Sequence, residues 1–143
     1  MALELTFAVQ NRDFKAAGDG VSELKRVLQE VGFSPGFIRR VAIAAFEAEM
    51  NIVIHAYRGR LQVRIEPHQI VLLAEDEGPG IPDVALAMQE GYSTAPPEIR
   101  EMGFGAGMGL PNIQRCADKL EIRSEVGRGT FLRAKFIYPD PKN

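Results

Sequence analysis

The feature that most constrains the fold of this chain is a polar stripe inside an otherwise apolar helix. Ser34 followed by Pro35 is typical of a helix N-cap and first turn. Glu47, Asn51 and His55 then recur every four residues, so they form one aligned stripe on a helix. The stripe faces either a cavity, where an acid and an amide would indicate chemistry, or solvent, and this stretch alone leaves both open. Its apolar positions are Ile38, Val41, Ala42, Ala45, Phe46, Met50, Val53, Ile54 and Tyr57.

Apolar periodicity along the rest of the chain predicts an α+β protein. We expect the central helix to end at Gly59-Arg60, and we expect Glu49 to point away from the stripe and be solvated. Alternation predicts a strand over 3–9 and a hairpin over 61–74, and helical spacing predicts helices over 14–31 and from 110 onward. A short helix over 83–89 and a final hairpin of strands 119–125 and 130–137 complete the prediction.

Length and composition favour one globular domain over residues 1–143. With 45% hydrophobic residues and a net charge of −2, the chain gives no indication of a nucleic-acid partner. Cys116 is the only cysteine, so no intramolecular disulfide can form, and a zinc site has too few ligands. We find no secretion signal and no apolar run long enough to cross a membrane, so we expect a cytoplasmic protein without membrane contact.

Two glycine-rich stretches are candidates for ligand binding. Asp76, Gly78 and Gly80 follow a buried strand, where glycines let the backbone approach a ligand beside a carboxylate, although a plain turn explains the pattern equally. The stretch 103–110 leads into a helix, and free N–H groups at a helix start suit phosphate. It matches neither the dinucleotide fingerprint nor the Walker motif, and a flexible linker is the alternative. We interpret the loop at about 90–108 as a mobile lid.

The order of these motifs resembles a known superfamily. Glu47-x-x-x-Asn51, Asp76-x-Gly78-x-Gly80, Gly105-x-Gly107-x-Gly109 and Gly127-x-Gly129-Thr130 follow one another as in the ATP-binding domain of GHKL proteins, over roughly residues 3–137. Within it, the chain looks most like the bacterial anti-sigma factor serine/threonine kinases, because residues 47–57 follow their helix pattern and Gly107-Met108-Gly109-Leu110 follows their lid.

The resemblance implies a fold and a set of residue roles. The fold would be a Bergerat-type two-layer α/β sandwich, with a mixed, mostly antiparallel sheet covered on one face by helices. Glu47 would be the general base, Asn51 would hold Mg²⁺ against the phosphates of ATP, and Asp76 would accept the adenine amino group. The other implied nucleotide-binding residues are Gly78 and Gly80 beside the base, Thr130 through its hydroxyl or a water, and Gly105, Gly107, Met108, Gly109 and Leu110 around the phosphates. The roles of His55 and Arg100 stay open.

Three functions are compatible with these motifs. The resemblance favours transfer of the ATP γ-phosphate to a Ser or Thr of a small antagonist, an anti-anti-sigma protein of the STAS type, with a sigma factor as a further partner. The alternative is a non-catalytic nucleotide-dependent binding module. A metabolic ATPase is disfavoured because so short a chain has little room for a second pocket. The resemblance also suggests a homodimer, formed through the surface of 14–32 or a sheet edge.

Overall fold

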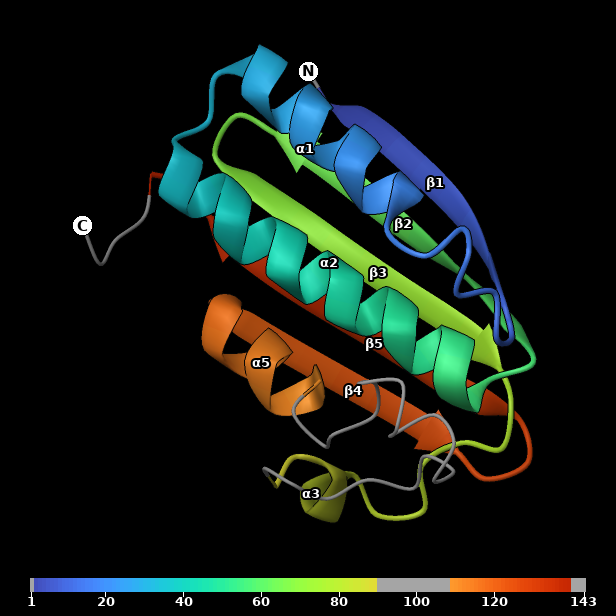
Figure 1. Ribbon diagram of the computed structural model, residues 1–143. Helices are drawn as coiled ribbons and strands as arrows, with labels where there is room; N and C mark the ends of the chain where they lie inside the picture. Colours follow the sequence, from blue (N-terminus) through green and yellow to red (C-terminus); the bar gives the residue numbers. More distant parts are fainter. Residues whose placement is uncertain (1, 90–108, 140–143) are drawn as a thin grey trace.

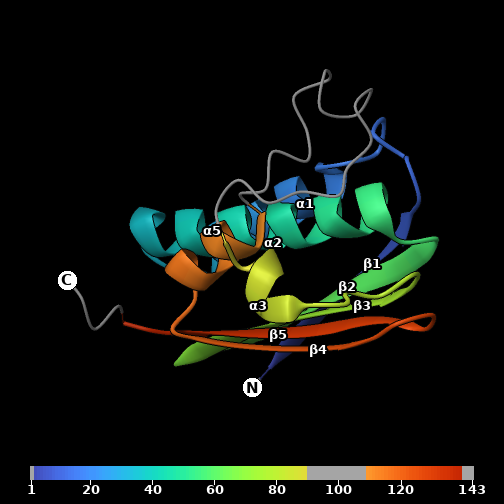
Figure 2. The same cartoon turned by 90° about the horizontal axis from the view of Figure 1, so that it is seen from below.

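The fold is an open sheet with helices packed on one of its faces. Figure 1 shows the computed structural model, which describes residues 2–89 and 109–139. The elements, in chain order, are β1 Leu3–Gln10, α1 Asp19–Val31, α2 Pro35–His55, β2 Arg58–Glu66, β3 Gln69–Glu77, α3 Val84–Ala87, α5 Gly109–Cys116, β4 Lys119–Glu125 and β5 Gly129–Ile137. Seen along the sheet, α1, α2 and α5 lie together on the same side of the strands (Figure 2).

The five strands run in the order β1-β2-β3-β5-β4. All four neighbouring pairs are antiparallel, so the sheet is more uniform than the mixed, mostly antiparallel one expected from the sequence. The two predicted hairpins are present: β2 pairs with β3 from Arg58↔Glu77 to Glu66↔Gln69, and β4 pairs with β5 from Lys119↔Lys135 to Glu125↔Gly129. The central strand β3 therefore delivers Asp76 near its carboxyl end, beside β5.

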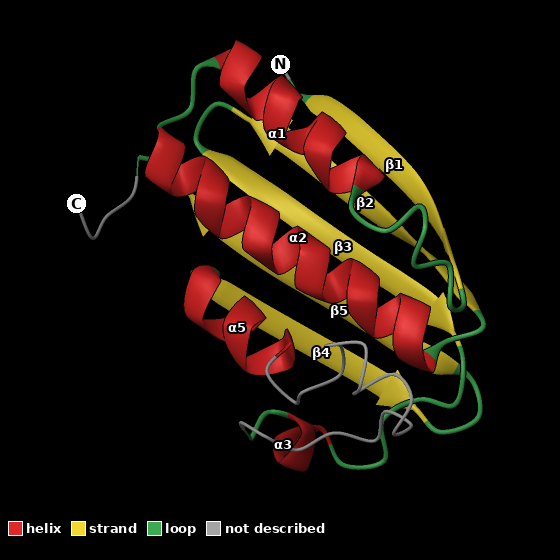
Figure 3. Ribbon diagram, viewed as in Figure 1, coloured by secondary structure: helices red, strands yellow, loops and turns green. Residues whose placement is uncertain are grey.

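Helix α2 runs over the middle of the sheet and carries most of the helical side of the core (Figure 3). Burial of its apolar residues against the sheet supplies the main driving force for the two-layer packing. The buried positions of α2 are Phe37, Ile38, Val41, Ala42, Ala44, Ala45, Ala48, Glu49, Met50, Ile52, Val53 and Ile54. They meet inward-facing strand residues that include Leu61, Val63, Ile70, Leu72, Leu132, Ala134 and Phe136.

The boundaries of the first two helices differ from the sequence prediction. The first helix starts at Asp19 rather than at residue 14, because Gly18 adopts a left-handed conformation with φ 95° that ends the preceding turns. Helix α2 begins at Pro35 as expected but ends at His55, so Gly59 and Arg60 belong to β2. Tyr57 consequently lies outside the helix and is 66% exposed, and it adds nothing to the apolar face.

Other local predictions are confirmed with small shifts. Gly32 ends α1 in a left-handed conformation, and its N–H donates to the Leu28 carbonyl. The short helix α3 covers Val84–Ala87, and the Asp83 side chain caps it by accepting from the Leu86 N–H. Among the described helices, none is long and apolar enough to span a membrane.

Candidate nucleotide site

Glu47 stands on the exposed side of α2, next to the start of α5. Its carboxylate is half-buried and accepts a hydrogen bond from the Asn112 side chain on α5. Gly109 also lies close to this carboxylate, because a Cβ built at that glycine would lie 3.1 Å from Glu47 Oε2. Burial raises the pKa of the Glu47 carboxyl, and the Asn112 hydrogen bond opposes this rise. A carboxylate with a raised pKa is better suited to accept a proton near neutral pH than an ordinary surface glutamate.

Asn51 and His55 continue the stripe toward the carboxyl end of α2, and both are half-buried. In the part of the chain that the structure describes, the Asn51 amide has no hydrogen-bond partner, which leaves its oxygen available as a ligand. Burial lowers the pKa of His55, so this imidazole is neutral at physiological pH. The stripe predicted from the four-residue spacing therefore lines a partly enclosed surface rather than bulk solvent.

Asp76 is held at the carboxyl end of β3 by the neighbouring strand β5. Asp76 Oδ1 accepts the Thr130 backbone N–H at 3.0 Å, and the carboxylate is half-buried. Burial raises the pKa of Asp76, and the hydrogen bond from Thr130 opposes this rise. Because Thr130 occupies only Oδ1, the second carboxylate oxygen can accept a hydrogen bond from a ligand.

The loop that follows β3 interlocks with the turn between β4 and β5. The Gly78 N–H donates to the Arg128 carbonyl at 3.0 Å, and the Gly127 N–H donates to the Pro79 carbonyl at 2.9 Å. Gly80 has φ 78°, and a Cβ built there would lie 2.4 Å from the Glu125 carbonyl oxygen. The glycine at position 80 is thus required by the close approach of two loops, in addition to any approach of a ligand.

The two halves of the site meet where α2 ends. The Tyr57 N–H donates to the Glu77 carbonyl at 2.8 Å, which ties the end of α2 to the end of β3. A Cβ built at Gly78 would lie 2.9 Å from Ala56 Cα, so the loop after β3 packs directly on the same point. The fold therefore places Asp76 and its hydrogen-bond partner Thr130 beside the helix that carries Glu47 and Asn51.

Several predicted site residues fall outside the described part of the chain. These are Gly105, Gly107, Met108 and Arg100, together with the lid proposed at about 90–108. Gly109 and Leu110 form the first turn of α5, as expected for a glycine-rich segment that enters a helix, and Leu110 is buried.

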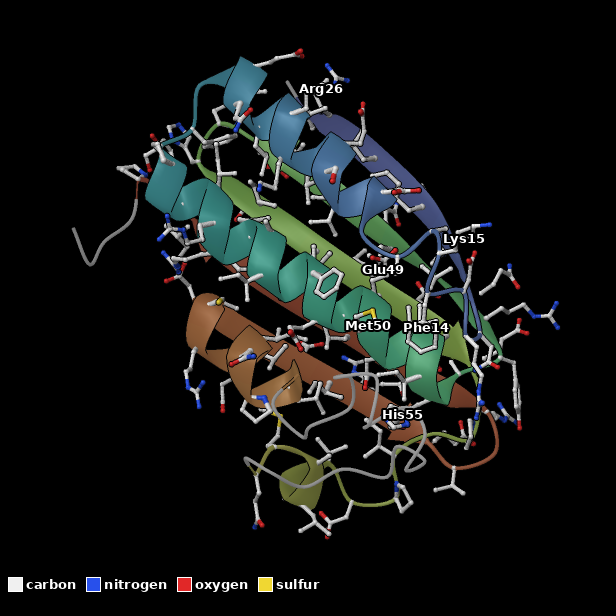
Figure 4. All side chains as sticks on the ribbon, viewed as in Figure 1. Phe14, Lys15, Arg26, Glu49, Met50 and His55 are labelled. Carbon is white, nitrogen blue, oxygen red and sulfur yellow. The ribbon has the colours of Figure 1, made fainter. Side chains whose placement is uncertain are left out.

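The prediction that Glu49 is solvated was wrong. Glu49 is only 6% exposed, and its Oε1 accepts the Gly18 N–H at 2.8 Å. Figure 4 shows the side chain on α2, facing the segment that enters α1. Burial raises the pKa of this carboxyl, and the hydrogen bond from Gly18 opposes the rise. Glu49 therefore tethers the start of α1 to α2 and faces away from the Glu47 stripe.

Two polar residues of the site were not singled out in the sequence. Asn112 donates a hydrogen bond to the Glu47 carboxylate, and its Oδ1 accepts from Arg115 Nη1 at 3.0 Å.

Ser124 contacts the loop after β3, since its Oγ accepts the Ile81 N–H at 2.6 Å. Ser124 could have been found, because the alternation of β4 places it on the same face as Leu120 and Ile122. A hydroxyl in line with inward-facing apolar residues requires a partner.

The chain is similar to several known proteins. The family model for the histidine kinase-like ATPase domain matches residues 15–136. The serine/threonine-protein kinase RsbT of Bacillus subtilis is 32% identical over 114 residues, which cover 77% of this chain and 80% of that protein. An anti-sigma F factor of Clostridium kluyveri is 30% identical over 145 aligned positions, which cover 96% of this chain and 94% of that protein.

A solved structure supports the fold independently. The mycobacterial sensor histidine kinase MprB superposes with a TM-score of 0.53 over 94% of this chain and 97% of that one, at 16% sequence identity. At that identity the likeness concerns the fold alone. The family model, which matches residues 15–136, shows that the chain belongs to the histidine kinase-like ATPase family.

Proposed function

We propose that this protein is a Mg-ATP-dependent serine/threonine kinase that phosphorylates a small antagonist protein of the STAS type. The observation that carries the proposal is the placement of Glu47: a half-buried carboxylate with a raised pKa, one helical turn from Asn51, at the start of α5. The names of the relatives, a serine/threonine kinase and an anti-sigma factor, support both the reaction and the kind of partner.

The described residues fit ATP and a magnesium ion. Asp76 has an oxygen available for the adenine amino group, and the Asn51 amide oxygen is a suitable hard ligand. The described ranges contain no group of three or more His, Cys, Asp or Glu residues that could hold a metal by themselves. Asn51 would therefore bind Mg²⁺ together with the phosphates of the substrate, and the ion would neutralise charge on the transferring group.

Glu47 would act on the acceptor hydroxyl. Its carboxylate takes the hydroxyl proton while the new oxygen–phosphorus bond forms and the bond to the β-phosphate oxygen breaks, with ADP as the leaving group. Asn112 keeps the carboxylate directed toward the start of α5. The free N–H groups of Gly109 and Leu110 at the start of α5 would bind negative charge on a phosphate.

The experiment is a labelling assay in lysate of the source cells. Tagged protein is incubated with radiolabelled ATP and Mg²⁺, and retained proteins are examined for phosphoserine and phosphothreonine by mass spectrometry. We expect one small protein to be labelled, and we expect EDTA to abolish the labelling. Glu47→Gln should remove the label, whereas Glu49→Gln, the same change two residues along α2, should keep it.

The alternative is a nucleotide-dependent binding module without transfer, and the anti-sigma factor name of one relative favours it. In that case a sigma factor is retained and the wild-type protein produces no phosphorylated partner. Undiminished labelling with Glu47→Gln would instead remove Glu47 from the role of base while leaving a kinase.

A further inference from the structure

A groove runs between α1 and α2, which lie side by side on the sheet (Figure 1). It has a volume of about 730 Å³, and its lining residues come from both helices and from the short connection between them. The floor is apolar and consists of the buried residues Val21, Phe33, Ile38 and Ala42. Ile43, which also lines the groove, is 40% exposed, so apolar surface remains accessible to a partner.

The charged side chains of the groove are separated along its length. Lys25 on α1 and Arg39 on α2 are exposed, and neither forms an ion pair with another residue of the described ranges. Arg39 lies about one turn after the start of α2, whereas Glu47 lines the groove about 12 Å further along the same helix. The groove therefore carries positive charge toward the start of α2 and a carboxylate toward the other end.

Glu47 borders both the groove and the candidate nucleotide site. Its carboxylate accepts a hydrogen bond from Asn112 on α5 and lies close to Gly109, and the same residue lines the groove on the α1 side of α2. A segment that occupies the groove would therefore end beside the proposed general base.

We propose that this groove docks the acceptor protein through an amphipathic helix that carries acidic residues at one end. The inference rests on the proposed function, because it identifies how the acceptor hydroxyl reaches Glu47. The apolar face of the docked helix contacts the floor, and its carboxylates pair with Lys25 and Arg39. The acceptor hydroxyl lies toward the Glu47 end, where carboxylates would be repelled, so charge also sets the direction of docking.

The walls of the groove favour a helix over an extended segment. Except at their ends, α1 and α2 use their backbone groups within the helices, so the groove offers a partner mainly side chains. An extended segment would leave its own backbone groups unpaired over the apolar floor, whereas a helix satisfies them internally. A second copy of this chain fits less well, because Glu23 and Glu30 on its outer helix α1 already pair with Arg26.

The test uses the full chain and two side-chain-stapled helical peptides of about 12 residues, which match the length of the groove. Both peptides carry leucines at positions i, i+3, i+4 and i+7, and they differ only in ending with two glutamates or two lysines. Fluorescence anisotropy without nucleotide measures their binding. We expect the glutamate peptide to bind roughly tenfold more tightly, because two ion pairs take the place of two repulsive contacts.

Three variants assign this preference to the groove. Lys25→Glu combined with Arg39→Glu should reverse it, so that the lysine peptide binds more tightly. Arg26→Glu is the matched control and should keep the wild-type preference, because Arg26 follows Lys25 in the sequence but does not line the groove. Ile43→Asp should weaken the binding of both peptides, since it places a charge beside the apolar floor. Thermal melting curves show whether each variant is folded.

The lysate labelling assay connects the groove to the reaction. An excess of the glutamate peptide should reduce labelling of the acceptor protein, whereas the lysine peptide should not. Equal binding of the two peptides, or no binding, would overturn the docking surface. Labelling that the glutamate peptide leaves unchanged would overturn its use by the acceptor. If no protein is labelled while the peptide preference remains, the proposed kinase reaction fails and the groove remains a binding site for an acidic helix.

Discussion

The Glu49 carboxylate shows how burial and hydrogen bonding oppose each other at one residue. The side chain is 6% exposed, and Asp13 and Asp19 add negative charge nearby. Its hydrogen bond to the Gly18 N–H satisfies a backbone group in front of α1 that would otherwise lack a partner. Because burial dominates, the pKa in the folded protein lies above the usual value of 4.5.

This raised pKa predicts a pH-dependent effect of Glu49→Gln. A raised folded pKa contributes stability that is present below the unfolded pKa and is lost as pH rises through the folded pKa. The wild type should lose stability as the Glu49 carboxyl ionises, whereas glutamine stays neutral. The free energy of unfolding of Glu49→Gln should therefore rise relative to that of the wild type between pH 4.5 and about pH 7.5. Urea unfolding at both pH values measures the difference, and a pH-independent difference would contradict the prediction.

Glu49→Leu tests the hydrogen bond separately from the charge. Leucine cannot accept from the Gly18 N–H, so this variant should be less stable than Glu49→Gln by about 1–3 kcal/mol at either pH. Equal stability of the two variants would show that the Gly18 N–H finds another acceptor.

Gly80 and Gly127 provide a test position and a matched control for the close contact between the two loops. Both have positive φ, 78° and 84°, but a Cβ at Gly80 would lie 2.4 Å from the Glu125 carbonyl oxygen, while Gly127 has nothing within 4 Å. We expect Gly127→Ala to lower the free energy of unfolding by about 1 kcal/mol through backbone strain alone. Gly80→Ala should lower it by at least about 2 kcal/mol and should weaken ADP binding. Similar losses in both variants, measured by urea unfolding, would show that the loops separate easily.

At the scale of elements, periodicity identified the strands and the central helix because each buries one face against the other layer. It failed at the start of α1, where Phe14 and Ala17 fit a helical spacing but Gly18 turns the chain. Periodicity also failed to predict the burial of Glu49. The residue spacing within α2 cannot show that the segment around Gly18 packs against the side of the helix that carries Glu49. Asn112 was missed because its partner Glu47 lies far away in the sequence.

Helix α5 follows the glycine-rich segment, and Arg40 on α2 anchors its far end. Arg40 Nε donates to the Cys116 carbonyl at 2.9 Å, and Arg40 Nη2 lies 3.4 Å from Asp118 Oδ2. The same Asp118 oxygen accepts the Ile137 N–H at 2.7 Å, so α2, α5 and β5 are joined at one point.

Removing this anchor should loosen α5 selectively. We expect Arg40→Ala to lower hydrogen-exchange protection of the α5 amides by about tenfold while α1 stays protected, because the contacts with Cys116 and Asp118 lie at the end of α5. Arg26→Ala is the control, since Arg26 forms exposed ion pairs with Glu23 and Glu30 on α1, and such pairs contribute little. A uniform loss of protection across the whole sheet would contradict this local role.

At the scale of the whole molecule, the two-layer packing brings together motifs that are far apart in the sequence. The helices share one face of the sheet (Figure 2), and the ends of α2 and β3 meet at Ala56 and Gly78. The ordered motifs predicted this fold and the family, because they recur in one architecture. They could not predict which side chains join the motifs, since Ser124 and Asn112 act through contacts between elements.

The homodimer stays a prediction, with two surfaces to compare. Strand β1 forms one edge of the sheet and α1 is the outer helix beside it (Figure 1). A lysine on an edge strand opposes pairing with another strand, so Thr6→Lys should shift a β1-mediated dimer to monomer in sedimentation velocity. Ser22→Lys should do so only if α1 forms the interface. A wild-type protein that is monomeric at all concentrations would contradict the prediction.

The central claim is that Glu47 accepts the proton during phosphoryl transfer. The most direct measurement is the rate of transfer to the purified partner by Glu47→Gln at saturating Mg-ATP, with nucleotide affinity measured in parallel. We predict unchanged affinity and a rate reduced by at least about a hundredfold, with Glu49→Gln near the wild-type rate. A Glu47→Gln protein that binds Mg-ATP normally and transfers phosphate at the wild-type rate would contradict it.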